Sequence, residues 1–430
     1  MFVNIYRKKV AIYTLGCKVN QYESDGMAEC LKKEECEIVP FHEVADVYII
    51  NTCAVTNMAE RKSRQIINRA RKKNSDAIIV AAGCYVQSEG EHLKQDLGID
   101  IIVGNNRKKD IARILDEYYL EHKVDDNLID INKSCEYEEL LVTKPSEHCR
   151  AYVKVQDGCN NFCSYCIIPY TRGRIRSREV EDVMREVKEL ASSGIREVVI
   201  TGINLSSYCD SNGTTLLGLL QKVSTVDGID RIRMGSLEPR IITEEFLQGI
   251  STNAKICPHF HLSLQSACNE TLKRMNRKYT IEMYAEKCDM IRRYYDRPAI
   301  TTDIIVGFPG ETEEEFATTV DNLEKINLYE MHVFKYSKRN GTVAADMPNQ
   351  VDDRIKEERS NILLEMAKRH KKDYERSFEG STLSVLVEEY EEQDGKCYLK
   401  GHTDRYILVR HSADKEECIN SVNKIINLKY

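Results

Sequence analysis

The sequence predicts an α/β protein in three parts: an N-terminal domain built on a parallel sheet, a central incomplete barrel of six β/α units, and a small C-terminal β unit. Three observations lead to this fold class. The 430 residues exceed what one hydrophobic core usually serves. Short runs rich in Val and Ile alternate with amphipathic helical segments, and the end of the chain changes to alternating strands.

The N-terminal part, residues 1–125, alternates apolar runs with helical segments. Helical patterns cover Asn57–Lys73 and residues 86–95, so strand, helix and strand follow one another as in a parallel sheet with right-handed crossovers. The apolar runs are typical of buried strands and cover residues 10–16, 46–52, 77–83 and 100–104.

Three cysteines each follow directly after one of the first three strands. Cys17, Cys53 and Cys84 are separated by 36 and 31 residues. Ligands of open α/β sheets bind outside the carboxyl ends of the strands, so the three thiols are expected to converge at one edge. The alternative is that they are small, buried packing residues.

Composition points to a reducing compartment. The N-terminal residues lack the unbroken apolar segment of a signal peptide, and no run of about 18 apolar residues occurs. We therefore expect a soluble, cytoplasmic protein without a membrane segment, in which the 16 cysteines serve packing, metal binding or catalysis rather than disulfides. A net charge of −7 argues against a protein coated with positive charge, although a local basic surface stays possible.

The central part follows an acidic, irregular stretch, residues 126–144, which is interpreted as a linker. Residues 145–375 then repeat the strand and helix pattern, and a helix over 178–191 has Ser177 as its expected N-cap. Six strands are expected, at 152–156, 197–201, 231–235, 259–264, 300–306 and 330–336.

A compact cysteine motif lies just after the first of these strands. Cys159, Cys163 and Cys166 have the spacing C-x3-C-x2-C. Three thiolates on one loop can hold three irons of a [4Fe–4S] cluster and leave the fourth iron open for chemistry. A zinc site is the alternative, but it requires a fourth Cys or His close by, and none follows in the loop.

This loop resembles the signature of radical S-adenosylmethionine (SAM) enzymes, C-x3-C-x-aromatic-C, with Tyr165 before Cys166. More narrowly, the chain is similar to the methylthiotransferases of that superfamily. Matching blocks occur in family order along nearly the whole chain: "TLGCKVNQYESD", "NTCAVTNMAERKSRQ", "AGCYVQ", "DGCNNFCSYCIIPYTRGRIRSR", "GSLEP", "HFHLSLQS", "LKRMNRKYT" and "TDIIVGFPGETEEEF".

The resemblance implies two [4Fe–4S] clusters and SAM as cofactors. Cys159, Cys163 and Cys166 would hold the cluster that binds SAM, in a radical SAM barrel, and Cys17, Cys53 and Cys84 would hold a second, auxiliary cluster. Asn20 and Gln87 follow cluster cysteines closely, and they are either polar contacts to that cluster or ordinary polar residues at helix starts.

Further cofactor contacts are expected at the ends of the barrel strands. Ser236 and Glu238 follow the third strand and suit ribose hydroxyls, and Gln265 ends the fourth strand. Each is also compatible with an ordinary turn. Ala267 replaces a glycine that is usual in the family, which puts the loop near Gln265 in question. The second strand ends with Thr201, Gly202 and Asn204, where the superfamily meets the methionyl amine.

The C-terminal part, residues 376–430, follows a charged helix over 352–376. It alternates like strands and carries an Asp394-Gly395 hairpin signal. It resembles a TRAM domain, which implies a small β-barrel that binds RNA. Its eight Lys/Arg against ten Asp/Glu are an unusual balance for phosphate contact.

The resemblance also implies a substrate. Family branches act on tRNA adenosines beside the anticodon or on a ribosomal aspartate, and the N-terminal blocks look most like the branch for N6-threonylcarbamoyladenosine. Isopentenyladenosine in tRNA and the ribosomal aspartate are the alternatives. Implied partners are the anticodon stem-loop of tRNA, a sulfur source, and an electron donor such as flavodoxin or ferredoxin.

Basic residues offer independent but modest support for an RNA substrate. Asn57–Lys73 is rich in cations, either for phosphates or as a solvated face. After the cluster loop come Arg172, Arg174, Arg176 and Arg178, which are expected to contact substrate or cofactor. A non-catalytic electron carrier or RNA-binding module is the distant alternative, and a carrier would close both clusters with four ligands where only three are seen.

Overall fold

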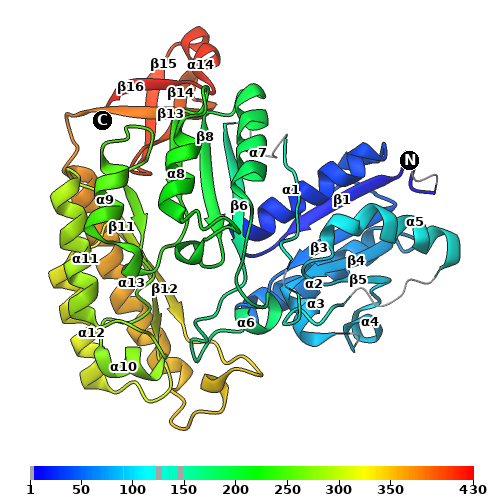
Figure 1. Ribbon diagram of the computed structural model, residues 1–430, viewed down its shortest axis with the longest axis horizontal. Helices are drawn as coiled ribbons and strands as arrows, with labels where there is room; N and C mark the ends of the chain where they lie inside the picture. The colour runs from blue at the N-terminus through cyan, green and yellow to red at the C-terminus, as the bar shows by residue number, and fades with distance from the viewer. Residues whose placement is uncertain (1–3, 91, 123–127, 135, 144–148) are drawn as a thin grey trace. The chain divides into compact units, whose positions relative to one another are not determined.

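The computed structural model describes residues 4–90, 92–122, 128–134, 136–143 and 149–430 (Figure 1). The chain divides into two compact units. The first contains the described residues of Met1–Ser146 together with Tyr152–Glu179 and Ser337–Ala345. The second contains those of Glu147–Ala151 together with Val180–Tyr336 and Asp346–Tyr430.

The first unit is built on a parallel sheet with the strand order β2-β1-β3-β4-β5. This order confirms the predicted N-terminal parallel sheet and adds a short strand, β2, that was not predicted. Its strands are β1 (Lys9–Thr14), β2 (Glu37–Val39), β3 (Val47–Thr52), β4 (Ile78–Gly83) and β5 (Ile101–Val103).

Helices pack against this sheet, and each face has its own apolar core. Along β3, Tyr48 and Ile50 belong to one core, whereas Val47 and Ile49 belong to the other, as expected for side chains that alternate along a strand. A strand buried on both faces has a continuous run of apolar residues, so such a strand can be predicted from the sequence. The main helices are α1 (Lys18–Lys33), α2 (Asn57–Lys73) and α5 (Ile111–Glu121), with the 3₁₀ turn η1 (Lys108–Asp110) before α5.

The predicted helix Asn57–Lys73 is confirmed as α2. It begins at Thr56, whose hydroxyl accepts a hydrogen bond from the amide of Ala59. The prediction for residues 86–95 was wrong, because the chain forms two short helices, α3 (Cys84–Glu89) and α4 (His92–Leu97), instead of one. Gly90 adopts φ +66° after α3, and this left-handed residue ends the helix.

Described residues of the segment predicted as a linker pack within the first unit. Leu140 and Val142 form a small core with Tyr22, and the Tyr137 hydroxyl donates to the carbonyl of Lys154 over 2.7 Å. The unit also contains most of β6 (Arg150–Asp157), α6 (Ile168–Thr171), β7 (Arg176–Ser177) and the 3₁₀ turn η4 (Val343–Ala345). The domain boundaries at 125, 144 and 375 stay a prediction.

The second unit holds the remaining strands of the predicted barrel. Neighbouring strands pair in parallel: β8 with β9, β10 with β11, and β11 with β12. A parallel bridge between Leu237 and Leu262 joins the segments that follow β9 and β10. The strands are β8 (Glu197–Gly202), β9 (Arg231–Met234), β10 (His259–His261), β11 (Ala299–Val306) and β12 (Glu330–Lys335).

Helices follow these strands in the expected alternation. The predicted helix at 178–191 begins at Val180, slightly later than expected, and the predicted charged helix is confirmed with Asp352 as its N-cap. The helices are α7 (Val180–Ser192), α8 (Leu216–Ser224), α9 (Glu244–Ser251), α10 (Asn269–Arg274), α11 (Ile281–Tyr294), α12 (Glu313–Ile326) and α13 (Asp353–Arg376).

The C-terminal part forms an antiparallel sheet with the order β15-β14-β13-β16. Asp394 and Gly395 both have positive φ between β13 and β14, which confirms the predicted hairpin turn. A bulge between Val387 and Glu389 increases the local curvature of β13. The elements are β13 (Thr382–Gln393), β14 (Lys396–Thr403), β15 (Leu408–Ala413), α14 (Lys415–Ser421) and β16 (Ile425–Lys429).

Buried ion pairs attach this sheet to the barrel strands. Glu197 on β8 accepts hydrogen bonds from Arg150 and Arg233 at 2.9 and 2.8 Å. Arg233 also donates to the carbonyl of Asp404, and Arg150 to the carboxylate of Glu388. Because these cations lower the pKa of Glu197 to about 2, against the cost of its burial, the pair network holds a fixed charge inside the unit.

Among the described residues, no helix is both long and apolar enough to cross a membrane.

Candidate cluster and cofactor sites

The three dispersed cysteines lie at one edge of the first unit's sheet. Cys17 precedes α1, Cys53 follows β3, and Cys84 begins α3. Because β1, β3 and β4 are neighbours, their carboxyl ends share this edge. In a sheet of order 2-1-3-4-5, the ligand crevice lies at the switch point between the first and third strands, where Cys17 and Cys53 follow. We call these three cysteines the auxiliary site.

Two glycines allow the backbone to pack closely around the auxiliary site. Gly16 has φ +99°, and a Cβ there would lie 2.9 Å from both Cβ and Sγ of Cys53. Gly83 has φ +95°, and its Cβ would lie 2.6 Å from Oδ1 of Asn51. A larger residue at either position would therefore be strained and would collide with a neighbour.

The thiols of the auxiliary site are close enough to influence one another electrostatically. Burial, with a further contribution from Cys84, raises the pKa of the Cys53 thiol to about 12. Cys53 and Cys84 are buried, whereas Cys17 is exposed to solvent. Metal binding requires the thiolate form, so loading this site would release protons.

Asn20 lies beside Cys17 of the auxiliary site. Its Oδ1 is 3.8 Å from Sγ of Cys17, and its Nδ2 donates to the carbonyls of Leu15 and Thr52. The Asn20 side chain therefore joins the two loops that carry Cys17 and Cys53.

Gln87, the other predicted polar contact, has a different role. Its Oε1 accepts from the amide of Asn105 and its Nε2 donates to the carbonyl of Ile129. It is Asn105, a residue that sequence reasoning missed, whose Nδ2 approaches Sγ of Cys84 at 3.5 Å while donating to the carbonyl of Thr171 at 2.7 Å.

The loop of residues 159–166 belongs to the same unit as the auxiliary site. The amide of Cys159 donates to the carbonyl of Gly173 at 3.1 Å, and the amide of Cys166 to the carbonyl of Cys163 at 2.9 Å. Gly158 adopts φ +71°, and a Cβ there would lie 1.9 Å from the carbonyl oxygen of Arg174, so only glycine fits. The loop is therefore held in a fixed turn.

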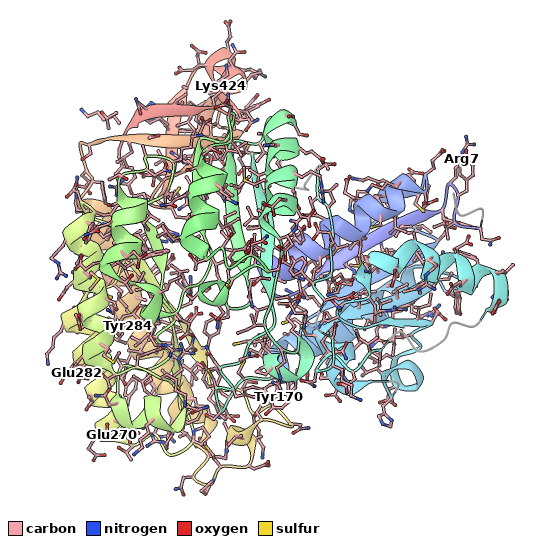
Figure 2. All side chains as sticks on the ribbon, in the orientation of Figure 1. Arg7, Tyr170, Glu270, Glu282, Tyr284 and Lys424 are labelled. Carbon is pink, nitrogen blue, oxygen red and sulfur yellow. The ribbon has the colours of Figure 1, made fainter. Side chains whose placement is uncertain are left out.

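Solvent reaches this loop only in part. Cys163 is buried, while Cys159, Cys166 and Tyr165 are partly exposed. α6 follows directly and carries Tyr170 (Figure 2). The ring of Tyr170 contacts that of Phe162 edge to face. The carbonyl of Ser164 accepts a hydrogen bond from the amide of Ala344, so the segment 337–345 supports the loop from a distant part of the sequence.

The arginines after the loop are mostly not available to a substrate. Arg172, Arg176 and Arg178 are buried, so they are not exposed to tRNA phosphates, whereas the expected contact with a cofactor stays a prediction. Arg178 pairs with Glu139, and Arg176 donates to the carbonyls of Arg172 and Arg174. Only Arg174 of the four is exposed, and its guanidinium lies 4.5 Å from the centre of the Phe162 ring.

Arg172 is the centre of a buried ionic network. Its Nη1 donates to Glu23 at 2.7 Å and its Nη2 to Oδ1 of Asn20 at 2.6 Å. Lys108 and Lys154 also donate to Glu23, and Lys154 pairs with Asp157 at 2.6 Å. The network links α1, β6 and the segment after the cluster loop, directly beside the auxiliary site.

The basic residues of α2 divide into two groups. Arg71 donates to Asp100 at 2.6 Å and to three carbonyls, and Lys73 donates to the carbonyl of His42, so both have structural roles. Arg64 also has a partner, because its Nε donates to the Tyr85 hydroxyl at 2.7 Å. The other cations lie on one side of the helix and form what we call the exposed stripe. In this stripe Arg61, Lys62, Arg69 and Lys72 are exposed, next to the exposed Met58.

In the second unit, the predicted cofactor residues lie at the carboxyl ends of parallel strands. Ser236 and Glu238 follow β9, and one oxygen of Glu238 is already bound by Arg277 at 3.0 Å. Arg277 was not found from the sequence, although it belongs to the block "LKRMNRKYT". Thr201 and Gly202 end β8, and Asn204 precedes the 3₁₀ turn η2 (Leu205–Ser207).

Gln265 has a strained backbone. It adopts φ +74°, while its amide donates to the carbonyl of Asp303 and its carbonyl accepts from the amide of Ile305. Such a conformation in a residue with a side chain is typical of functional sites. Ala267 is fully buried and is not a left-handed residue, so the missing glycine causes no strain there.

A further polar group lies on the same strand face as Gln265. His261 is four residues earlier, and its ring nitrogens lie 2.9 Å from the Thr301 hydroxyl and 3.3 Å from the Asp303 carboxylate. The ring of His332 on β12 stacks on His261. Alternation in "HFHLSLQ" is the sequence signal that places His261 and Gln265 on one face.

Two family models match separate parts of the chain. Residues 9–104 match the Uncharacterized protein family UPF0004, and residues 153–323 match the Radical SAM superfamily. The radical SAM methyltransferase TsrM from Kitasatospora setae aligns with a TM-score of 0.59 at 17% identity, over 79% of this chain and 74% of that one. At this identity the likeness concerns the fold alone.

Proteins found by sequence comparison have a much higher identity to this chain. The Threonylcarbamoyladenosine tRNA methylthiotransferase MtaB of Bacillus subtilis is 40% identical over 98% of this chain and 94% of its own length. The protein of that name from Aquifex aeolicus is 40% identical over 88% of this chain and 92% of its own length. A tRNA-2-methylthio-N(6)-dimethylallyladenosine synthase of Thermoanaerobacter pseudethanolicus is 39% identical over 97% of this chain and 89% of its own length. The chain therefore belongs to the family of radical SAM tRNA methylthiotransferases.

Proposed function

We propose that this enzyme methylthiolates carbon 2 of N6-threonylcarbamoyladenosine next to the anticodon of tRNA. The observation that carries the proposal is the identity of 40%, over 98% of the chain, with a relative named for that nucleoside. Dimethylallyladenosine, also called isopentenyladenosine, is the second candidate, because relatives named for it reach 39% identity over 97% of the chain.

As a family member, the enzyme uses two [4Fe–4S] clusters and SAM. We assign the auxiliary cluster to Cys17, Cys53 and Cys84, and the SAM-binding cluster to Cys159, Cys163 and Cys166. The residues of the auxiliary site fit such a group, because three thiols approach one another beside the buried Nε of Arg172, which has no partner among the described residues. When bound, the cofactors supply a carbon-centred radical, a methyl group and sulfur.

The chain's own residues bind and orient these groups. Gly16 and Gly83 let two loops approach, and Asn20 joins them, so the auxiliary thiols are positioned before the cluster binds. In the second unit, Glu238 with its partner Arg277 suits ribose hydroxyls, and Gln265 presents an amide from a strained backbone. Thr201, Gly202 and Asn204 are assigned to the methionyl end of SAM, and Tyr165 to the cluster loop.

Partners follow from the reaction. Reductive cleavage of SAM takes one electron, so a low-potential donor such as flavodoxin or ferredoxin is needed, and each transferred sulfur must be replaced by a sulfur source. A tRNA substrate places this work in the cytoplasm. We assign the exposed stripe Arg61, Lys62, Arg69 and Lys72 to contacts with tRNA phosphates.

Mass spectrometry of tRNA nucleosides tests this function and the two ligand sets together. The gene is expressed in a bacterial strain that lacks its own methylthiotransferases, as wild type and as two triple variants, Cys17/Cys53/Cys84→Ala and Cys159/Cys163/Cys166→Ala. Wild type should restore 2-methylthio-N6-threonylcarbamoyladenosine, and neither variant should. Purified, the auxiliary variant should still cleave SAM, and the other should not. Restoration of the dimethylallyladenosine product alone would select the second candidate.

A further inference from the structure

Arg172 lies among the auxiliary thiols rather than at the surface. Its side chain is 0% exposed. It interacts electrostatically with the thiols of Cys17, Cys53 and Cys84. The residue comes from the segment directly after the cluster loop, so one side chain connects that segment to the auxiliary site.

The two Nη atoms of this guanidinium make hydrogen bonds, whereas its Nε makes none to a described residue. Nη1 and Nη2 donate to Glu23, Asp157 and Asn20 at 2.6 to 3.3 Å. The remaining donor, Nε–H, is buried and has no hydrogen-bond partner among the described residues. A buried donor without a partner is costly, so this one calls for an acceptor that the protein itself does not provide.

The charges around Arg172 do not balance within the protein. Four buried cations, Lys108, Lys154, Arg172 and Arg176, face the carboxylates of Glu23, Asp157 and Glu138. Even with all three acids ionised, one positive charge is left over. A [4Fe–4S]²⁺ cluster held by three thiolates carries one net negative charge, which would offset it. Burial of an unpaired charge is otherwise strongly unfavourable.

We propose that Arg172 is a positioning residue for the auxiliary cluster: its guanidinium supplies the buried positive charge that offsets the cluster, and its Nε–H donates to one of the cluster's sulfur atoms. This inference rests on the proposed ligand set of the auxiliary site. Positive charge and hydrogen bonds to sulfur both raise the reduction potential of an iron–sulfur cluster. Arg172 therefore keeps the auxiliary cluster more easily reduced than it would otherwise be.

The reduction potential of the auxiliary cluster tests this. The full-length Cys159/Cys163/Cys166→Ala protein isolates that cluster, and its potential is measured by titration followed by electron paramagnetic resonance. Arg172→Gln should shift the potential to a more negative value, and Arg172→Lys, which keeps the charge, should shift it less. Arg178→Gln is the matched control, because it also removes a buried arginine of this unit. Arg178 is paired with Glu139, so its loss leaves the positive charge beside the auxiliary thiols in place.

An equal potential in Arg172→Gln and its parent, at equal iron content, would overturn the inference. Arg172→Gln should still fold, because both acids retain ion pairs in the variant. Glu23 remains paired with Lys108 and Lys154, and Asp157 remains paired with Lys154 and Arg176. If the variant nevertheless binds no iron, the inference is tested on the parent protein, Cys159/Cys163/Cys166→Ala with Arg172 intact, labelled with ¹⁵N-arginine. A ¹⁵N coupling to the reduced cluster in pulsed spectra supports the Nε–H contact, and its absence refutes it. A parent that holds no cluster would instead refute the ligand set itself.

Discussion

Gly16 and Cys53 lie in direct contact, so closely that a single methyl group at Gly16 would come within 2.9 Å of both Cβ and Sγ of the cysteine. The two residues follow neighbouring strands of the parallel sheet, β1 and β3. The contact therefore fixes how near the loops of the auxiliary site approach one another.

Substitution of Gly16 by alanine should disrupt the auxiliary cluster. The methyl group adds strain of about 1 to 2 kcal/mol at φ +99° and displaces the Cys53 side chain. We expect iron content to fall from about eight atoms per chain to about four, while SAM cleavage is retained. Gly98→Ala is the control, because Gly98 also has positive φ, +60°, but has nothing within 4 Å. Equal iron loss in both variants would show that backbone strain, rather than the contact with Cys53, is responsible.

Neutralising the exposed stripe of α2 should weaken tRNA binding. Changing Arg61, Lys62, Arg69 and Lys72 to Gln removes cations that can release counterions from phosphates, so the slope of log affinity against log salt should fall by up to about 3. Filter binding over a salt series measures this. SAM cleavage without tRNA should not change.

A second quadruple variant serves as the control for this stripe. Lys222, Lys325, Lys368 and Lys372 are exposed lysines of the second unit, and changing them to Gln removes the same total charge. The assignment of the stripe is contradicted if this variant loses as much affinity and slope as the α2 variant.

Two substitutions of Gln265 separate its backbone from its side chain. Gln265→Gly relieves the strain at φ +74°, so it should be more stable to thermal unfolding than Gln265→Ala, by about 1 kcal/mol. If the amide contacts SAM, both variants should bind SAM equally weakly, as measured by calorimetry. Unchanged SAM affinity in both would remove Gln265 from the cofactor site.

Glu197 should make a stability contribution that depends on pH. Its pKa is lowered to about 2 by Arg233 and Arg150, so its stabilising effect is complete above the ordinary pKa of 4.5 and is lost as the pH falls towards 2. Glu197→Gln should cost about 3 kcal/mol at pH 7. Thermal melting of wild type and Glu197→Gln between pH 7 and pH 3 should show that the difference in their stability becomes smaller only at the acid end. A constant difference would contradict the lowered pKa.

The sequence was sufficient for the elements whose side chains repeat with a clear period. The strands buried on both faces appear as continuous apolar runs, and α2 has a cap at Thr56 and a regular apolar face. Cys17, Cys53 and Cys84 could be grouped because each one follows a parallel strand, and neighbouring parallel strands end at one edge.

The fate of the arginines could not be predicted in the same way. An arginine pattern looks the same whether it faces solvent or a buried carboxylate, and the partners of Arg172 and Arg178, Glu23 and Glu139, lie far away in the sequence. Similarly, the left-handed backbone at Gln265 is imposed by pairing with Asp303 and Ile305 on β11, and no local residue signals it.

The most direct test of the function is a competition between two substrates in one reaction. Purified, reconstituted enzyme with SAM, reductant and a sulfur source is given equal amounts of two anticodon stem-loops, one carrying N6-threonylcarbamoyladenosine and the other isopentenyladenosine. Mass spectrometry of the digested products should show methylthiolation of the threonylcarbamoyl nucleoside at carbon 2, with little of the other. Preferential methylthiolation of isopentenyladenosine, or of neither nucleoside while SAM is cleaved, would contradict the account.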